Sequence, residues 1–157
     1  MFYWVVILVT VIDQGFKLWV RMHMDVGESI VIWHGILNFT HYQNSGAAGS
    51  TFQGYGRYFI IPAVLFVGYL LYSRRKGNLK GGWVEAGTAF LAGGAIGNAI
   101  DRLLFGQVTD FIKFQFGRGI LNMADEAINI GVVILLADAI KSVAADWRRR
   151  DRNRAGA

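Results

Sequence analysis

Two aspartates, Asp110 and Asp125, lie at the ends of a short polar interruption between long apolar runs. A carboxylate beside an apolar environment is costly unless it pairs, shares a proton or meets a cation. If the two face each other, one can stay protonated while the other is ionised, and such a pair activates water for hydrolysis. The alternative is structural: Asp110 ends a strand, and Asp125 occupies the first turn of the next helix, where the helix dipole favours an anion.

The composition is typical of a membrane protein. Of the 157 residues, 54% are hydrophobic and only 17% are charged, and the mean hydropathy is +0.35. Apolar runs predict four transmembrane helices at about 2–20, 58–72, 83–100 and 127–145. The sequence therefore predicts a mainly α membrane protein that folds as one integral-membrane domain over 1–157. The chain has a basic tail at 146–157, whose arginine-rich stretch 148–154 is expected to be disordered.

Cysteine and histidine usage bounds the chemistry. The chain has no cysteine, which excludes disulfides, thiolate catalysis and cysteine-held metal clusters. His23, His34 and His41 are irregularly spaced and have no acidic cluster nearby, so we expect no histidine metal site.

Basic residues set the expected topology. Of the 16 lysines and arginines, four lie in 74–80 and six at 141–154, and four spans put both regions on one side, expected to be the cytoplasm. The net charge of +5 is thus interpreted as a topology signal and not as a nucleic-acid site. The connections 23–57 and 102–125 then share the outer side, where they gather the polar residues of the candidate site.

The outer connections carry strand signals. Residues 29–33 and 36–42 are rich in β-branched and aromatic side chains around His34-Gly35, which predicts a hairpin. Alternation within 108–121 predicts a further strand, which can extend the hairpin into a small extracytoplasmic sheet. A run of small residues at 44–50 permits close backbone approach or a turn.

Polar residues near the helix ends have structural interpretations as well. Asp13 and Lys17 are four residues apart on one helical face, and we interpret them as an ion pair inside the helix bundle. The G-x-x-x-G pattern at 93–97 predicts tight helix packing. Asn98 and Asp101 share a face, and a hydrogen-bonded helix end is the alternative to a functional role for them.

Five short motifs follow one another along the chain. They are Asp13-Gln14-x-x-Lys17, Asn44-x-Gly-Ala-Ala-x-Ser50, Gly93-Gly-Ala-x-Gly-Asn98-x-x-Asp101-Arg102, Val108-x-Asp110-Phe111 and Asn122-x-Ala124-Asp125. In this order they resemble the bacterial lipoprotein signal peptidase (signal peptidase II) family, over about residues 2–145.

The resemblance implies an aspartyl endopeptidase of the bacterial cytoplasmic (inner) membrane. Such an enzyme removes the signal peptide from prolipoproteins by cleaving before a diacylglyceryl-modified cysteine, without a metal or cofactor. The implied partners are the lipid-modified prolipoprotein and membrane lipids, with no nucleic acid. Both termini would be cytoplasmic and the active site would lie on the outer face. The catalytic pair falls on Asp110 and Asp125. The supporting or substrate-binding residues would be Asp13, Lys17, Asn44, Gly46, Asn98, Asp101, Arg102, Asn122 and Ala124.

The chain departs from the family pattern at a few positions. Gly49 and Leu121 stand where the family usually has phenylalanine, and the segment 111–121 is short. These changes affect the substrate cleft and its lid more than the aspartate pair. Two alternatives stay open: a non-catalytic lipoprotein-binding paralogue of the same fold, and a small proton-coupled transporter that uses Asp13 and Lys17 as a midplane site.

Overall fold

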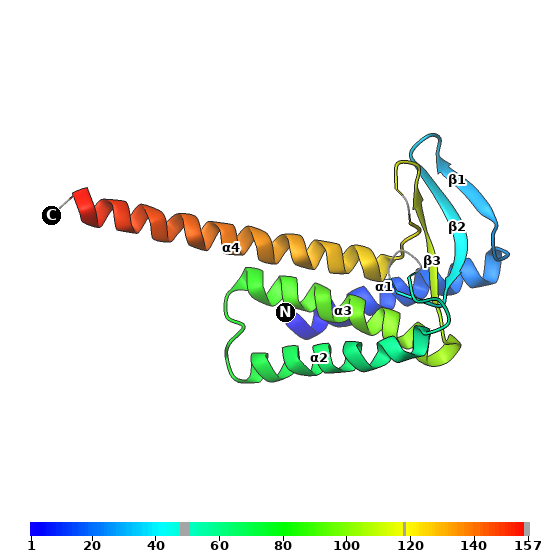
Figure 1. Ribbon diagram of the computed structural model, residues 1–157, viewed down its shortest axis with the longest axis horizontal. Coiled ribbons are helices and arrows are strands. Elements are labelled where there is room, and N and C mark those ends of the chain that lie inside the picture. Colours follow the sequence, from blue (N-terminus) through cyan, green and yellow to red (C-terminus); the bar gives the residue numbers. More distant parts are fainter. Residues whose placement is uncertain (48–50, 118, 156–157) are drawn as a thin grey trace.

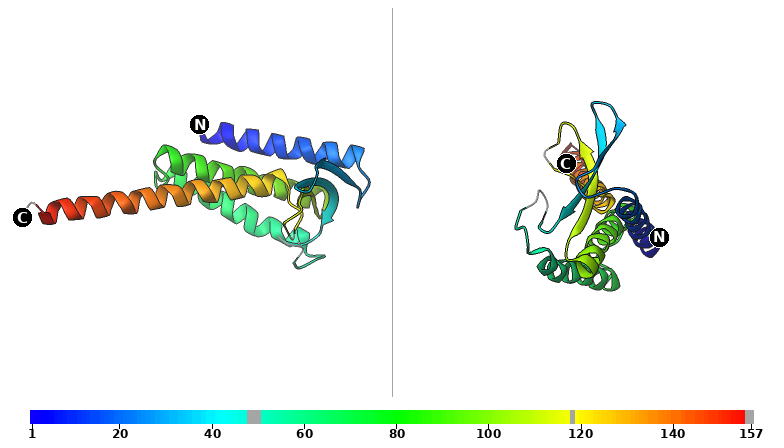
Figure 2. Two further views of the ribbon diagram at one scale, coloured as in Figure 1. Left: turned by 90° about the horizontal axis from the view of Figure 1, so that it is seen from above. Right: turned by 90° about the vertical axis from the view of Figure 1, so that its right-hand side faces the viewer.

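The computed structural model describes residues 1–47, 51–117 and 119–155. Four long helices run side by side: α1 (Phe2–His23), α2 (Ile60–Arg75), α3 (Gly82–Phe105) and α4 (Met123–Ala155) (Figures 1 and 2). A short 3-10 helix, η2 (Gly56–Phe59), leads into α2. The four predicted spans fall on these four helices, except that residues 58 and 59 belong to η2. Three segments are long and apolar enough to cross a membrane: Phe2–His23, Gly56–Arg75 and Met123–Arg150.

Helix α3 lies at the centre and packs against α1, α2 and α4. Glycines on α3 allow this close approach, which confirms the tight packing predicted for 93–97. A Cβ at Gly94 would overlap the Ala124 carbonyl of α4, and a Cβ at Gly97 would overlap the Asp13 carboxylate of α1.

A small antiparallel sheet lies across the ends of the helices, where α1 ends and α4 begins (Figure 1). Its strands are β1 (Ser29–Trp33), β2 (Leu37–Asn44) and β3 (Val108–Phe114), in the order β1-β2-β3. The predicted hairpin and third strand are both confirmed. The segment after β3 folds back, so that Leu121 exchanges two backbone hydrogen bonds with Ile112, of 2.7 and 2.9 Å. This return brings the start of α4 beside β3.

Several expectations from the sequence are wrong. The stretch 148–154 is not disordered, because α4 continues through residue 155 (Figure 1). Alanine and arginine favour helix, and extending an existing helix avoids the cost of nucleation. Asp110 does not end a strand but is the third residue of β3. Helix α3 does not end at 98–102 but continues to Phe105, and Gly106 follows it in the left-handed conformation. Gly49 and Ser50 lie outside the described residues.

Candidate active site

Asp110 and Asp125 are joined through one residue, Asn122, which contacts one carboxyl with its side chain and the other with its backbone. Asp110 is buried in β3, and Asp125 is half-buried in the first turn of α4. The Asn122 amide Nδ2 donates to Asp110 Oδ1 at 2.6 Å, and the Asn122 backbone N–H donates to Asp125 Oδ2 at 3.3 Å. The fold therefore brings together two carboxyls that are separated by a strand and a turn in the sequence.

The start of α4 fixes the orientation of Asp125. Asn122 immediately precedes the helix, and its Oδ1 accepts a hydrogen bond from the Asp125 backbone N–H at 3.0 Å. Together with the reverse bond from Asn122 N–H to the Asp125 carboxylate, this makes a capping box. The first-turn position predicted for Asp125 is confirmed. The cap leaves the side-chain Nδ2 of Asn122 free to donate to Asp110.

Two further asparagines complete the hydrogen bonding of the carboxyls. Asn44 Nδ2 donates to Asp110 Oδ2 at 3.0 Å, and Asn98 Nδ2 donates to Asp125 Oδ1 at 2.8 Å. Asn44 Oδ1 accepts from the Gly46 N–H at 3.0 Å and from Gln53 Nε2 at 3.2 Å, which defines the amide orientation. All four carboxyl oxygens of the Asp110–Asp125 pair therefore accept an N–H.

Burial, and secondly the neighbouring Asp125 carboxylate, raise the pKa of Asp110 from 3.8 to about 7. The N–H donors of Asn122 and Asn44 and the charge of Lys17 oppose this rise in pKa without cancelling it. Asp110 can therefore hold a proton near neutral pH, which the acid of a two-carboxyl acid–base pair must do.

A buried ion cluster lies directly behind the pair. Lys17 Nζ is 2.8 Å from Asp13 Oδ2 and 3.7 Å from Asp101 Oδ2, and all three side chains are fully buried. The ion pair predicted between Asp13 and Lys17 is confirmed. Lys17 also donates to Asn98 Oδ1 at 2.9 Å, and Asp13 Oδ1 accepts from the Ala124 N–H at 2.8 Å. The cluster thus ties α1 to α3 and to the first turn of α4.

Sequence reasoning missed Gln14, Arg21 and Thr109. Arg21 Nη1 lies 3.3 Å from Asp101 Oδ1 and donates to Thr109 Oγ1 at 3.0 Å. Asp101 Oδ2 accepts from the Thr109 N–H at 2.9 Å, which fixes the residue next to Asp110. Gln14 Nε2 donates to the Gly97 carbonyl at 3.0 Å. The spacing of Arg21, four residues after Lys17 on the same helical face, is a signal that could have identified it.

Arg102 connects the loop after β2 to this network. Its Nη2 donates to the Gly46 carbonyl at 3.0 Å, and its guanidinium lies 5.5 Å from the centre of the Phe59 ring. All the site residues predicted from the sequence thereby fall in one connected set of contacts. Within residues 1–47, 51–117 and 119–155, no three His, Asp or Glu side chains gather as metal ligands would.

Comparison with known proteins identifies the family. The profile of the family described as Signal peptidase (SPase) II matches residues 5–141. The chain belongs to the signal peptidase II family. A lipoprotein signal peptidase of Gloeobacter violaceus is 38% identical over 143 residues, covering 90% of this chain and 82% of that protein. One from Listeria welshimeri is 35% identical, over 86% of this chain and 90% of its own.

Similarity to a solved structure extends the match to the fold. A bacterial membrane enzyme, determined by the in meso method at 2.3 Å resolution, superposes with a TM-score of 0.86 at 28% identity. The superposition covers 92% of this chain and 90% of the other. As a signal peptidase II family member with three strongly apolar helices, the chain is a multi-pass membrane peptidase. The transporter alternative is not favoured, because Asp13 and Lys17 are paired and fully buried.

Proposed function

We propose that this chain removes signal peptides from prolipoproteins by cutting before a diacylglyceryl-modified cysteine, with Asp110 and Asp125 as the catalytic pair. The observation that carries the proposal is the pair itself, held by Asn122 at the ends of apolar helices, with Asp110 buried and its pKa raised. Family membership and the names of the relatives support the removal of signal peptides from lipoprotein precursors.

The proposed mechanism assigns the acid role to Asp110 and the base role to Asp125. Asp125 is half-buried and removes a proton from a water molecule, whose oxygen then adds to the scissile carbonyl carbon. Protonated Asp110 donates a hydrogen bond to the carbonyl oxygen as negative charge develops there. When the tetrahedral intermediate collapses, the proton taken from water passes to the amine of the departing cysteine. Water is the only co-reactant.

The remaining residues of the network serve as positioning residues in this proposal. Asn44, Asn98 and Asn122 orient the two carboxyls by their amide donors. Asp13, Lys17 and Asp101 hold α1, α3, α4 and β3 together through the buried cluster. Three further residues act through backbone contacts. Gly46 uses its carbonyl and its N–H, Ala124 uses its N–H, and Arg102 donates from its guanidinium to the Gly46 carbonyl.

The proposed placement is the bacterial cytoplasmic membrane, crossed four times by a single domain over 1–157. Helix α3 supplies the fourth span, because it runs beside three apolar helices and is packed between them. The basic residues of 74–80 and 141–154 then lie in the cytoplasm with both termini. The sheet and the Asp110–Asp125 pair lie at the outer face.

The topology predicts that cysteines introduced at Lys76 and Thr51 label from opposite sides of the membrane. The chain has no cysteine of its own, so each single substitution gives one labelling site. In intact cells, a membrane-impermeant maleimide should modify Thr51→Cys and should modify Lys76→Cys only after lysis. Labelling of both positions in intact cells would exclude this topology.

Purified wild-type protein should cleave a diacylglyceryl-modified precursor at least about tenfold faster than the unmodified one, because remote lipid contacts place the scissile bond. The measurement is the rate of signal peptide release from both precursors in detergent, with Asp110→Asn as the inactive control. Equal rates would exclude a lipid requirement. Failure to cleave either precursor would contradict the proposed activity and favour a non-catalytic binding protein.

A further inference from the structure

Helix α4 is longer than its neighbours and leaves the bundle at one end. It has 33 residues, against 22 in α1 and 24 in α3. At 1.5 Å per residue, α4 is about 50 Å long and α3 about 36 Å. Figure 1 shows the last part of α4, in orange and red, extending alone past the turn between α2 and α3. Every residue from 139 to 150 is exposed, so no other described helix covers this stretch.

Contacts between the helices show where α4 passes the end that the proposed topology places in the cytoplasm. Arg74, at the end of α2, pairs with Glu85 in the first turn of α3 and lies over the Phe2 ring of α1 at 4.8 Å. The ends of α1, α2 and α3 therefore meet at one level. A Cβ at Gly87, two residues after Glu85, would overlap the Leu135 side chain of α4. Helix α4 thus leaves the bundle within about two turns after Leu135.

Aromatic residues mark the membrane interface at the same end. Trp4, Tyr72 and Trp83 are exposed near these ends of α1, α2 and α3, and tryptophan and tyrosine favour the boundary between lipid and water. A hydrocarbon core of about 30 Å accommodates about 20 helical residues, so α4 leaves it near residue 143. The exposed Trp147 then lies in the headgroup layer, and the residues that follow it lie among the phosphate groups.

The chain that follows Trp147 is strongly basic. The segment 146–154 contains five arginines and two aspartates, which gives it a net positive charge. Among the described side chains, none of its arginines pairs with a carboxylate, because the four ion pairs of the described residues all lie elsewhere. The described arginine side chains of this segment are all exposed: Arg148, Arg149, Arg150 and Arg152.

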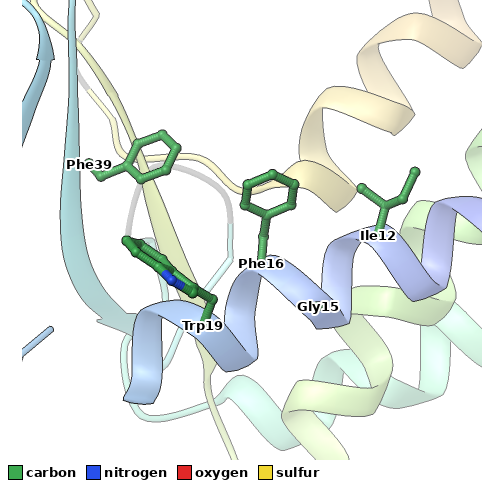
Figure 3. A pocket seen from close by; sticks show the side chains of 5 residues that line it. All are labelled: Ile12, Gly15, Phe16, Trp19 and Phe39. Atoms are coloured by element: carbon green, nitrogen blue, oxygen red, sulfur yellow. The ribbon is translucent and has the colours of Figure 1, made fainter. Parts of the chain in front are cut away.

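The outer end of the protein presents a different surface to lipid. An apolar groove of about 450 Å³ runs along α1 beneath the sheet, lined by Ile12, Gly15, Phe16, Trp19 and Phe39 (Figure 3). These five residues are all uncharged, so the groove offers a phosphate group no charged partner. Recognition of a headgroup phosphate is therefore expected at the arginines of α4 and not at this groove.

We infer that residues 146–154 of α4 bind the phosphate groups of anionic phospholipids in the cytoplasmic leaflet. A guanidinium is always charged, and its N–H donors match phosphate oxygens. Basic clusters immediately cytoplasmic of a transmembrane helix attract anionic headgroups. Because the first arginines lie within the headgroup layer beside Trp147, lipid is favoured over a nucleic acid, which would approach from water. Bound lipid holds the cytoplasmic end of the helix whose first turn carries Asp125.

The test removes the charge and keeps the helix. The test variant combines Arg148→Gln, Arg149→Gln, Arg150→Gln and Arg152→Gln, and glutamine favours helix about as much as arginine does. The matched control carries lysine at the same four positions. Full-length protein in neutral detergent is mixed with equal amounts of dioleoyl phosphatidylglycerol and dioleoyl phosphatidylcholine, and native mass spectrometry counts the lipids that it retains.

Wild type should retain phosphatidylglycerol over phosphatidylcholine by at least about fivefold, and the lysine control should keep most of this preference. The glutamine variant should retain the two lipids about equally. Added salt should reduce the preference of the wild type, because salt screens exposed charges. The assay needs no cleavage, so it tests this inference even if the proposed activity fails.

Thermal unfolding separates loss of binding from loss of fold. Because the four arginines are exposed, the glutamine variant should unfold within about 2 °C of wild type. If it unfolds earlier, Arg148→Gln combined with Arg149→Gln tests the same charge with fewer changes and should lower the preference at least about twofold. Equal retention of both lipids by wild type, or a preference that a folded glutamine variant keeps, would overturn the inference. Binding of a short single-stranded RNA without any lipid preference would assign the arginines to nucleic acid instead.

Discussion

Asp110→Asn and Asp125→Asn should each lower the cleavage rate by about 10³-fold or more, and the double variant should lose little beyond either single one. The two carboxyls share one task, since a base without its acid partner, or an acid without its base, cannot complete the reaction. Non-additivity of this size is a property of residues that act as one unit. The measurement is kcat with a lipid-modified precursor for both single variants and the double variant.

The controls separate loss of chemistry from loss of fold. In the wild type, the raised pKa of Asp110 means that ionising this carboxyl disfavours the folded state. Wild-type stability should therefore fall as pH rises from about 4 through about 7, while Asp110→Asn should lack this component. Wild-type activity should also fall above pH about 7 as Asp110 loses its proton. EDTA should leave the cleavage activity of the wild type unchanged. Substantial activity in either single variant, or loss with EDTA that zinc restores, would contradict the dyad.

The helices and the sheet could be predicted because their signals are local. Apolar runs of spanning length, and β-branched and aromatic residues around His34-Gly35, locate the helices and the hairpin. The ion pair of Asp13 and Lys17 follows from a spacing of four residues on one helix. In each case, the residues that interact are neighbours along the chain or share a periodic pattern.

The contacts that make the site specific are not local. The bonds from Thr109 N–H to Asp101 and from Ala124 N–H to Asp13 join residues brought together only by helix packing. The double role of Asn122 depends on the return of Leu121 along β3, which no periodicity indicates. The capping box of Asn122 and Asp125 could have been predicted, because an Asn followed three residues later by an acidic residue is its sequence pattern. Helix propensity alone would have corrected the prediction of a disordered tail, because its arginines favour helix.

Lys17→Met should destabilise the folded protein by about 3–5 kcal/mol, because it leaves the buried Asp13 carboxylate without its cation. The Lys17 ammonium contacts Asp13 Oδ2 at 2.8 Å and Asn98 Oδ1 at 2.9 Å, in a cluster that solvent does not reach. Methionine keeps the length and the apolar stem, so the loss reports the charge and not a cavity. The free energy of unfolding, from titration with a denaturing detergent, measures the effect.

Two further variants decide whether the cause is the uncompensated charge. Arg74→Met removes a cation from the partly exposed pair with Glu85, and it should cost clearly less because water can solvate the remaining carboxylate. Adding Asp13→Asn to Lys17→Met should restore part of the lost stability, since it removes the buried charge that Lys17→Met leaves unpaired. Cleavage should stay low in that double variant. The side-chain Oδ1 of Asn98 loses the Lys17 N–H that it accepted, and the Asn98 side chain orients Asp125. Two results would show that the buried cluster does not hold the helices around the catalytic pair. One is a loss of unfolding free energy from Lys17→Met that is no larger than the loss from Arg74→Met. The other is no recovery of stability when Asp13→Asn is added.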